Sequence, residues 1–464
     1  MLLTSSAYFF FLTGVFLLYW PFMRYRVPSL AIILLANYFF YAKWDLFYLA
    51  LIPIASTIDF FIGARIHITS NPKNRKLLVA LSVLLNLGML AAFKYMPFFL
   101  ENWAKLTATE PIKWNWTFPL GISFYAFQSL TYTIDIYRKD AAPTPSLLAY
   151  LSAVSFFPTT LAGPITNVST LIPQLENTGR KLDPVDGGRA LFLIGLGLMK
   201  KMLVADYIAE NLVNRVFDFP DLYSGAEVLT AVYAYAIQLY YDFSGYTDVA
   251  IGSAMLLGLK LPQNFNAPYS AINIADFWRR WHISLSNWLR DYLFFSLPGH
   301  RTKFWPYFNL ILTMAIGGFW HGASWNFLIW GLLHGFALAF VRWLESRRGR
   351  SPKKLPSALS TFFTVQFVCF AWIFFRSSSF EISGKILKRI ASGSVGFDNI
   401  SASLWIVLAI AIAGHYIKKE WFDFSRDSFA RVPFFAQAIV LMLLAIAIQY
   451  VASTGAAPFI YTKF

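Results

Sequence analysis

The stretch that decides the fold is GGFWHGASWNF, residues 317–327. It lies inside the run 304–341, which contains no Asp, Glu, Lys or Arg. A single helix of 38 residues would extend roughly 57 Å, well beyond a bilayer core about 30 Å thick. Non-helical backbone is tolerated at membrane depth only where it is buried in protein or lines a cavity. We therefore expect the run to break at Gly317-Gly318 and at Gly322, where the backbone is buried in protein or lines a cavity.

The whole chain has the composition of a polytopic membrane protein. Of its 464 residues, 57% are hydrophobic and 14% are charged, whereas soluble domains carry roughly 25% charged residues. The net charge of +15 is spread over short loops between apolar runs, which is the pattern of membrane insertion and not of a nucleic-acid-binding surface. Membrane lipid is therefore an expected partner, and nucleic acid is not.

Apolar runs of membrane-spanning length recur along the chain. The expected spans are 2–23, 27–42, 46–63, 77–100, 118–137, 360–375, 402–417 and 433–451. Basic residues favour the cytoplasmic side, so the loops 65–76 and 342–354 are expected in the cytoplasm and the N-terminus outside. Residues 190–199 are expected to be too short to span, because a pair of lysines follows them. Residues 268–303 mix aromatic and basic side chains, which is typical of interfacial or buried helices.

Two histidines stand in segments that are expected at membrane depth. His321 lies beside the expected break, with Ser324 and Trp325 on the same face if the helix resumes. His282 follows a Trp-Arg-Arg-Trp run. A histidine in such surroundings must stay neutral and find hydrogen-bond partners. Each is therefore either a helix-to-helix hydrogen-bonding residue or a general base in a dry cavity.

A second polar cluster is predicted around YDFSGYTD, residues 241–248. Asp242 and Asp248 interrupt an otherwise uncharged run, and the Ser-Gly pair between them is expected to bend the helix. An unpaired carboxylate at that depth would be costly. Both are therefore expected to be structural partners of Arg279 or Arg280. Ion coupling in a transporter is the alternative.

Other catalytic chemistries find little support in the residues. Cys369 lies in the apolar stretch FVCFAWIFF, which disfavours the reactive thiolate. The chain contains no G-x-S-x-G serine elbow. Its histidines and aspartates match no compact ligand motif, so no metal site is expected. The remaining histidines are expected to be structural; they are His67, His300, His334 and His415.

Six blocks of sequence, in order, resemble the signature of a known family. They are PLGISFYAFQSLTYTIDIYR (119–138), SFFPTTLAGPI (155–165), YYDFSGYTDVAIG (240–252), LPQNFNAPY (261–269), DFWRRWHISLSNWLRDYLFFSL (276–297) and GGFWHGASWNFLIWGLLHG (317–335). Together they resemble the membrane-bound O-acyltransferase family, and most closely its bacterial polysaccharide branch. That branch contains subunits for alginate O-acetylation and for teichoic-acid D-alanylation. The stretch WIFFRSSSF at 372–380 and the ending PFIYTKF resemble the acetylating members.

The resemblance implies a fold and a set of site residues. The implied fold is an all-α polytopic membrane protein, in which a ring of tilted helices with broken and interfacial segments surrounds a central funnel. One membrane-embedded acyltransferase domain would cover 1–464, with the signature core at about 119–345 and additional spans in 1–118 and 355–464. The family's catalytic histidine corresponds to His321, and its second polar position to His282. Weaker candidates for holding the donor are Ser324, Trp325 and Asn326.

The resemblance also implies a reaction and its partners. An acyl group, most simply acetyl, would move from a cytoplasmic thioester such as acyl-CoA to a hydroxyl acceptor, with no bound cofactor. Expected partners are a secreted or membrane-anchored acyltransferase and an exported polysaccharide such as alginate, at the bacterial inner membrane. The alternatives are a transporter or flippase of an activated acyl group or polysaccharide precursor, and a scaffold that only assembles an export complex.

Overall fold

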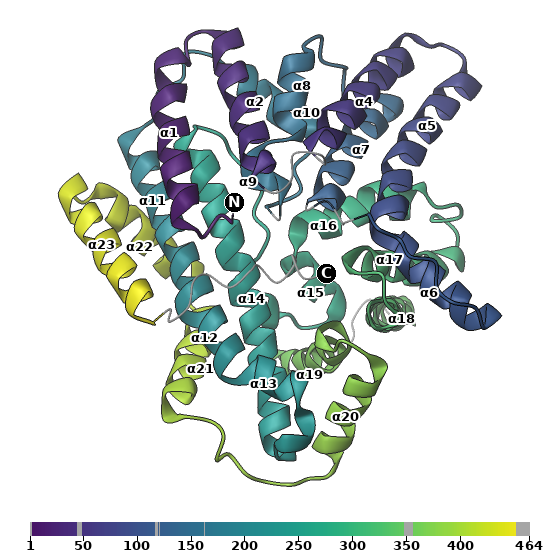
Figure 1. Cartoon of the computed structure of the whole chain (residues 1–464), viewed down its shortest axis with the longest axis vertical. Coiled ribbons are helices and arrows are strands. Elements are labelled where there is room, and N and C mark those ends of the chain that lie inside the picture. The colour runs from purple at the N-terminus through teal and green to yellow at the C-terminus, as the bar shows by residue number, and fades with distance from the viewer. Residues whose placement is uncertain are drawn as a thin grey trace. The chain divides into compact units, whose positions relative to one another are not determined.

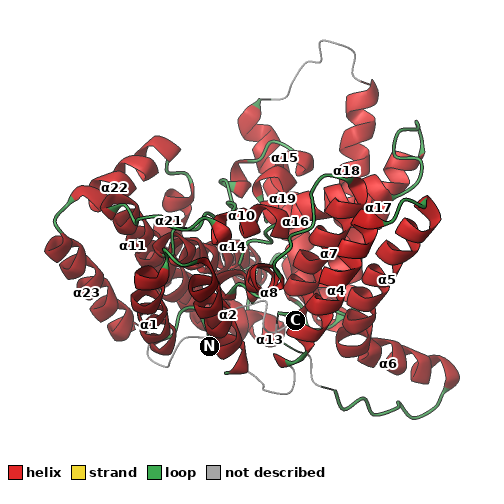
Figure 2. Cartoon of the chain, turned by 90° about the horizontal axis from the view of Figure 1, so that it is seen from above, coloured by secondary structure: helices red, strands yellow, loops and turns green. Residues whose placement is uncertain are grey.

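A computed structural model describes residues 2–43, 49–116, 119, 121–161, 163–347 and 356–451. These residues form helices and loops, with no strand among them (Figure 1, Figure 2), so the expected all-α class is confirmed. The chain divides into two compact units, one of Met1–Ile194 and Val249–Pro262 and one of Gly195–Asp248 and Gln263–Phe464. The single domain over the whole chain and the ring of helices around a funnel stay predictions.

The first unit is built around three helices that pack against one another, α4 (Leu51–Ile68), α5 (Pro72–Leu90) and α7 (Ile122–Arg138). Asp59 on α4 accepts hydrogen bonds from Ser82 at 2.6 Å and from Asn86 at 2.7 Å, both on α5. Ser129 on α7 donates to the same carboxylate at 2.7 Å. Since a carboxylate at membrane depth is costly unless donors surround it, this network determines how the three helices pack.

The other helices of the first unit flank these three. They are α1 (Ser6–Phe22), α2 (Arg26–Ala42), η1 (Ala91–Tyr95), α6 (Met96–Thr107), α8 (Leu147–Val154), α9 (Phe157–Thr160) and α10 (Val168–Glu176). Serine side chains cap the first turns of α1 and α8, because Ser5 accepts from the Tyr8 amide and Ser146 from the Ala149 amide. The boundary between the units falls inside α11 (Pro184–Leu198) and α14 (Gly225–Leu256).

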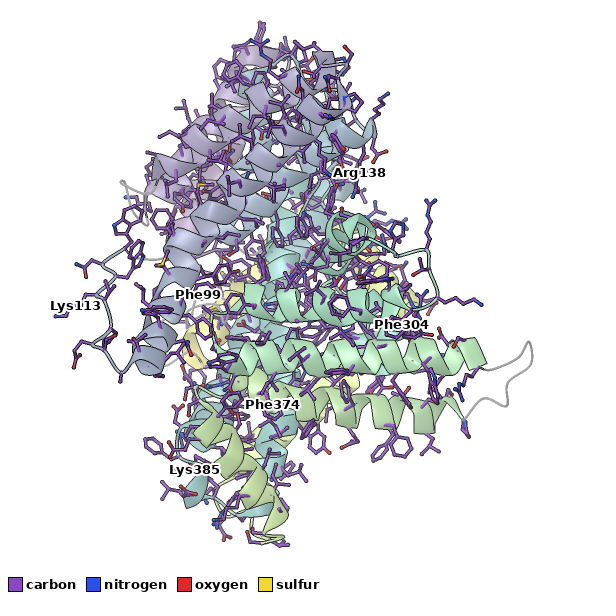
Figure 3. All side chains as sticks on the ribbon, turned by 90° about the vertical axis from the view of Figure 1, so that its right-hand side faces the viewer. Phe99, Lys113, Arg138, Phe304, Phe374 and Lys385 are labelled. Atoms are coloured by element: carbon purple, nitrogen blue, oxygen red, sulfur yellow. The ribbon has the colours of Figure 1, made fainter. Side chains whose placement is uncertain are left out.

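The second unit contains the signature blocks from residue 263 onward. Its elements are η2 (Met199–Ala205), α12 (Asp206–Ile208), η3 (Ala209–Val213), α13 (Asn214–Asp218), η4 (Pro220–Leu222), η5 (Pro268–Ser270), α15 (Ile274–Arg280), α16 (Ile283–Trp288), η6 (Leu289–Leu293), η7 (Phe294–Ser296), α17 (Trp305–His321), α18 (Trp325–Arg347), α19 (Ser357–Arg376), α20 (Phe380–Ala391), α21 (Ala402–His415), α22 (Lys419–Arg431) and α23 (Phe434–Val451), with the adjoining parts of α11 and α14. Figure 3 shows α17, α18 and α19 lying side by side, with Phe304 just before α17 and Phe374 on α19.

The uncharged run 304–341 breaks at one of the two expected places. α17 ends at His321 and α18 begins at Trp325, with Gly322 extended between them at φ −164°. A Cβ on Gly322 would lie 2.3 Å from the ring of Phe327, so the turn requires glycine for this close approach. This break leaves two helices, of 17 and 23 residues, in place of one helix too long for the bilayer.

The expected break at Gly317-Gly318 is wrong, because both residues lie within α17. Gly318 instead lets α17 and α18 pack backbone to backbone. A Cβ on Gly318 would lie 2.3 Å from the Phe327 carbonyl oxygen, and a Cβ on Gly331 would lie 2.3 Å from the Met314 carbonyl oxygen. Small residues at such an interface allow two membrane helices to approach closely, and here they bring the two sides of the break together.

Several described helices are long and apolar enough to cross a membrane. They are Leu51–Ile68, Pro72–Thr107, Trp325–Arg347, Ser357–Arg376 and Phe434–Val451. The pair α21 and α22, bent by 97°, adds a sixth candidate if it counts as one span, and α1 and α2 are shorter apolar helices. The chain is therefore a multi-pass membrane protein, as its composition predicted.

Among the described helices, none of the candidate spans covers residues 190–199, as expected, but the lysine pair does not end the helix. The helical path continues from α11 through η2, α12 and η3 to α13. Lys200 and Lys201 lie within the helical path because Asp248 and Asp242 of α14 pair with them. These ion pairs offset the free-energy cost of placing two charges in an apolar segment. By contrast, 268–303 forms short helices whose Trp278, Trp281 and Trp288 are buried, so the expectation of buried helices is confirmed for that part.

Candidate active site

His321 is the last residue of α17, directly before the break at Gly322. The residue is 4% exposed. Its ring centroid lies 5.0 Å from that of Trp320, 5.2 Å from Trp330 on α18 and 5.3 Å from Phe375 on α19. Aromatic rings of three helices thus surround the imidazole. Such surroundings favour the neutral ring, which is the form that can accept a proton.

The rings around His321 belong to a larger aromatic cluster. Trp330 stacks on Trp372, with ring centroids 5.6 Å apart and planes at 16°. Trp281, next to His282 in the chain, lies 5.2 Å from Trp372. His334 also belongs to the cluster, because its Nδ1 accepts a hydrogen bond from Trp278 Nε1 at 3.3 Å. The cluster connects the environments of His321 and His282 through tryptophan side chains.

His282 occupies the turn between α15 and α16, fully buried. Its backbone is left-handed, with φ 43° and ψ 54°, a conformation that non-glycine residues adopt only where the surroundings impose it. Its ring and that of Phe243 are perpendicular, with centroids 4.6 Å apart. Burial lowers the pKa of His282 to about 3, so its imidazole is neutral throughout the physiological pH range.

Asn264 determines which ring nitrogen of His282 carries the proton. The Ser284 amide N–H donates to Asn264 Oδ1 at 3.0 Å, and the Ser284 hydroxyl donates to it at 2.8 Å. These donors identify that atom as the amide oxygen, which can only accept. His282 Nδ1 lies 3.3 Å from the same oxygen, so Nδ1 carries the proton and Nε2 carries the lone pair. His282 is thus equipped to accept a hydrogen bond through Nε2 and not to donate one.

Ser324 and Asn326 make structural contacts at the start of α18. The Ser324 hydroxyl accepts from the Phe327 amide at 3.4 Å, which caps the helix. Asn326 is buried, and its Nδ2 donates to the Ser377 carbonyl just after α19 at 2.8 Å. Trp325 is 49% exposed and begins α18, across the break from His321. A role of these residues in holding the donor stays a prediction.

The predicted pairing of Asp242 and Asp248 with arginines is wrong. Lys201 Nζ lies 2.5 Å from Asp242 and 2.5 Å from Asp206, and Lys200 Nζ lies 2.6 Å from Asp248. These ion pairs join α14 to η2. One turn earlier, on α11, the Gly197 carbonyl oxygen would lie 2.6 Å from a Cβ on Gly245. α14 runs through its Ser-Gly pair as one helix, and Gly245 leaves room there for the Gly197 backbone.

Arg279 and Arg280 pair within their own helix. Both contact Asp276, at 3.5 Å and 3.1 Å respectively. The Arg279 side chain is 67% exposed and that of Arg280 is 32% exposed, so both reach the surface. The sequence did offer an indication of the true partners. Lys200 and Lys201 are two adjacent charges inside an apolar run, and such charges need buried carboxylates.

The other expected sites are placed as follows. His334 and His415 are buried and packed against aromatic rings. Over the residues that the structure describes, no group of three or more His, Cys, Asp and Glu side chains could hold a metal ion. Asn264, Trp330 and Phe375 were not singled out from the sequence, because nothing in the spacing of such distant residues indicates that they meet.

The chain matches a family of membrane enzymes. A family model described as the membrane-bound O-acyltransferase family, MBOAT, matches residues 83–383. That range contains the α-helices that contribute to the site, α14 to α19, and both histidines. It covers well over half of the chain.

Individual relatives are bacterial acyltransferases. A peptidoglycan O-acetyltransferase of Helicobacter pylori is 37% identical over 395 residues, covering 80% of this chain and 74% of the relative. A probable alginate O-acetylase of Azotobacter vinelandii is 37% identical over 398 residues, covering 84% and 78%. A teichoic acid D-alanyltransferase of Bacillus subtilis is 29% identical over 284 residues, covering 56% and 69%.

Proposed function

The chain belongs to the membrane-bound O-acyltransferase family. From this premise we propose that it acetylates an exported polysaccharide, such as alginate, at the bacterial inner membrane. The donor would be a cytoplasmic thioester such as acetyl-CoA. The names of the relatives support acetyl as the transferred group, because the two O-acetylating relatives match more of the chain, at higher identity, than the D-alanylating one does. A secreted or membrane-anchored acyltransferase would act as the partner on the far side of the membrane.

The position of His321 is the observation that supports a catalytic mechanism. In the proposed reaction the neutral imidazole takes the proton of an acceptor hydroxyl as its oxygen attacks the thioester carbonyl carbon. The carbon–oxygen bond forms and the carbon–sulfur bond breaks. The thiolate then receives the proton from the imidazolium, which restores neutral His321. Aromatic rings around the site exclude water, which would otherwise hydrolyse the thioester.

His282 is proposed to orient the acceptor and not to stabilise the oxyanion. An oxyanion needs hydrogen-bond donors. The contact with Asn264 leaves the proton of His282 on Nδ1, so Nε2 offers a lone pair to the acceptor hydroxyl. The geometry at His282 thus favours orientation of the acceptor.

The transporter alternative is less well supported than acyl transfer. Its coupling groups would be Asp242 and Asp248, and both are engaged in ion pairs with lysines. A transporter would carry its cargo into vesicles without consuming the thioester, whereas the proposed enzyme releases one thiol for each ester formed.

The proposal is tested by replacing His321 with alanine in cells and measuring acetyl esters on exported polysaccharide and on peptidoglycan. His334→Gln is the matched control, because it removes another buried imidazole of the same aromatic cluster. We expect His321→Ala to abolish acetylation at matched amounts of folded protein, and His334→Gln to retain most of it. Normal acetylation in the His321→Ala strain would contradict the assignment of the base.

A further inference from the structure

A cavity of about 460 Å³ lies in the second unit between α14, α19 and α21. Apolar and aromatic side chains line it, among them Tyr233, Ile237, Val365 and Leu408. Neither His321 nor His282 is among its lining residues. The volume lies within the range of sites that bind small molecules or single chains, roughly 300–1,000 Å³.

The cavity is bordered by exposed apolar residues of α21. Trp405, Ile412 and Tyr416 line it and are 42%, 48% and 53% exposed. α21 is the apolar member of the bent pair that makes a candidate span. Exposed apolar side chains on such a helix face lipid chains, so the cavity is accessible from the hydrocarbon region of the membrane.

One polar group in the cavity wall lacks a partner. His415 is 7% exposed and lines the cavity. Its Nε2 accepts a hydrogen bond from the Tyr269 amide at 3.2 Å, so Nδ1 carries the ring proton. Among the described residues, nothing accepts a hydrogen bond from that Nδ1. A buried donor without an acceptor is costly, and an oxygen of a bound ligand would remove this cost.

The end of α21 places positive charge at the membrane interface. α22 follows at 97° to α21. It carries six charged residues among thirteen, so it cannot cross the hydrocarbon core, and its Trp421 and Phe424 are 67% and 69% exposed. These features are typical of a helix that lies along the interface. Lys418 and Lys419, both exposed, connect the two helices just beyond His415.

We propose that the cavity binds an acyl chain of an anionic glycerophospholipid. The chain occupies the apolar cavity, the ester carbonyl accepts the Nδ1–H of His415, and the phosphate lies near Lys418 and Lys419. The order of these features matches the order of groups in such a lipid. The apolar cavity corresponds to the acyl chain, the His415 Nδ1–H to the ester, and Lys418 and Lys419 to the phosphate. This binding site is separate from the candidate active site.

The cavity itself is tested with phosphatidylglycerol that carries a photoactivatable diazirine on one acyl chain. Purified full-length protein in detergent is irradiated with the probe, and labelled peptides are identified by mass spectrometry. Ala409→Trp fills the cavity from an exposed position of α21, and Ala413→Trp adds the same side chain to an exposed position outside it. We expect labelling of α19 and α21 peptides to fall at least fivefold in Ala409→Trp only. Equal labelling in the two variants would overturn the proposal.

The ligand class is tested by competition against the same probe. Unlabelled phosphatidylglycerol should displace the probe at a several-fold lower concentration than phosphatidylethanolamine or a free fatty acid. In the double variant Lys418→Gln, Lys419→Gln the preference over phosphatidylethanolamine should disappear. A fatty acid that competes as well as phosphatidylglycerol, or an unchanged preference in the double variant, would overturn the assignment of an anionic phospholipid.

Discussion

Asn264 contacts His282, which lies in the turn before α16, although the two residues are not neighbours in the sequence. The amide oxygen of Asn264 accepts hydrogen bonds from the backbone N–H and the hydroxyl of Ser284, and it lies 3.3 Å from His282 Nδ1. This contact orients an imidazole whose pKa burial has lowered to about 3. The sequence predicted that His282 matters, but it did not predict the tautomer, because the tautomer depends on a partner 18 positions away.

The lowered pKa of His282 predicts an acid sensitivity. The ordinary value is 6.5 and the folded value about 3. Between these values the unfolded chain binds a proton at His282 that the folded protein does not bind. The free energy of unfolding therefore decreases as pH falls below 6.5, by up to about 1.4 kcal/mol per pH unit, and this contribution is constant above 6.5.

This sensitivity is measured by thermal unfolding of wild type and His282→Gln in detergent at about pH 7 and about pH 5. The loss of stability on acidification should be smaller by about 2 kcal/mol in the variant. Other groups also titrate, so only the difference between the two proteins is informative. Identical pH dependence would show that His282 is not buried as the structure has it.

At the scale of elements, the packing of α17 on α18 depends on Gly318, which the sequence predicted to break the helix. The length of the uncharged run 304–341 correctly predicted a break, which occurs at Gly322. The same sequence could not show that Gly318 serves packing, because this depends on the Phe327 carbonyl of the returning helix. The length of an apolar run predicts that a helix forms. Which face of that helix packs against another depends on contacts between residues that are distant in sequence.

Gly318→Ala is expected to destabilise this pair. Its Cβ would lie 2.3 Å from the Phe327 oxygen, so the helices must separate, at a cost of about 1–3 kcal/mol. Gly14→Ala on α1 is the matched control, because nothing lies within 4 Å of the added Cβ. That variant should be neutral or more stable by up to about 1 kcal/mol. Thermal unfolding compares the two, and equal stabilities would refute the close approach of α17 and α18.

The ion pairs between α14 and η2 predict a second difference between variants. Asp242→Ala leaves Lys201 buried with one carboxylate fewer. Breaking a buried pair typically costs about 3–5 kcal/mol, so the amount of folded protein should fall, and Asp242→Asn should be milder. Arg279→Ala removes a side chain that is 67% exposed and should stay within about 0.5 kcal/mol of wild type.

Fluorescence-detected size exclusion and activity per folded molecule separate the outcomes for Asp242. We expect little folded Asp242→Ala protein, with near-normal specific activity in what remains. A stable, well-expressed but inactive variant would instead move Asp242 into the reaction centre or favour the transporter alternative.

For the whole molecule, the distribution of basic residues predicts an orientation. The loop at 65–76 and the end of α18 should be cytoplasmic, while the loop that carries Lys113, labelled in Figure 3, should lie outside. Single cysteines at Lys73, Ser346 or Lys113, in a Cys369→Ser background, are treated in intact cells with an impermeant thiol reagent. Only Lys113→Cys should be labelled. Labelling at Lys73→Cys or Ser346→Cys would reverse the orientation and the proposed side of the donor.

Catalysis by His321 is the central claim for the molecule, and thiol release by the purified protein tests it most directly. Full-length wild type, His321→Ala and His334→Gln are reconstituted in lipid vesicles with acetyl-CoA on the cytoplasmic side and polysaccharide acceptor on the other. Thiol release and acetyl ester formation are measured together. We predict that both fall about 10²–10⁴-fold in His321→Ala and stay near wild type per folded molecule in His334→Gln. Undiminished thiol release and ester formation in folded His321→Ala protein would contradict the account.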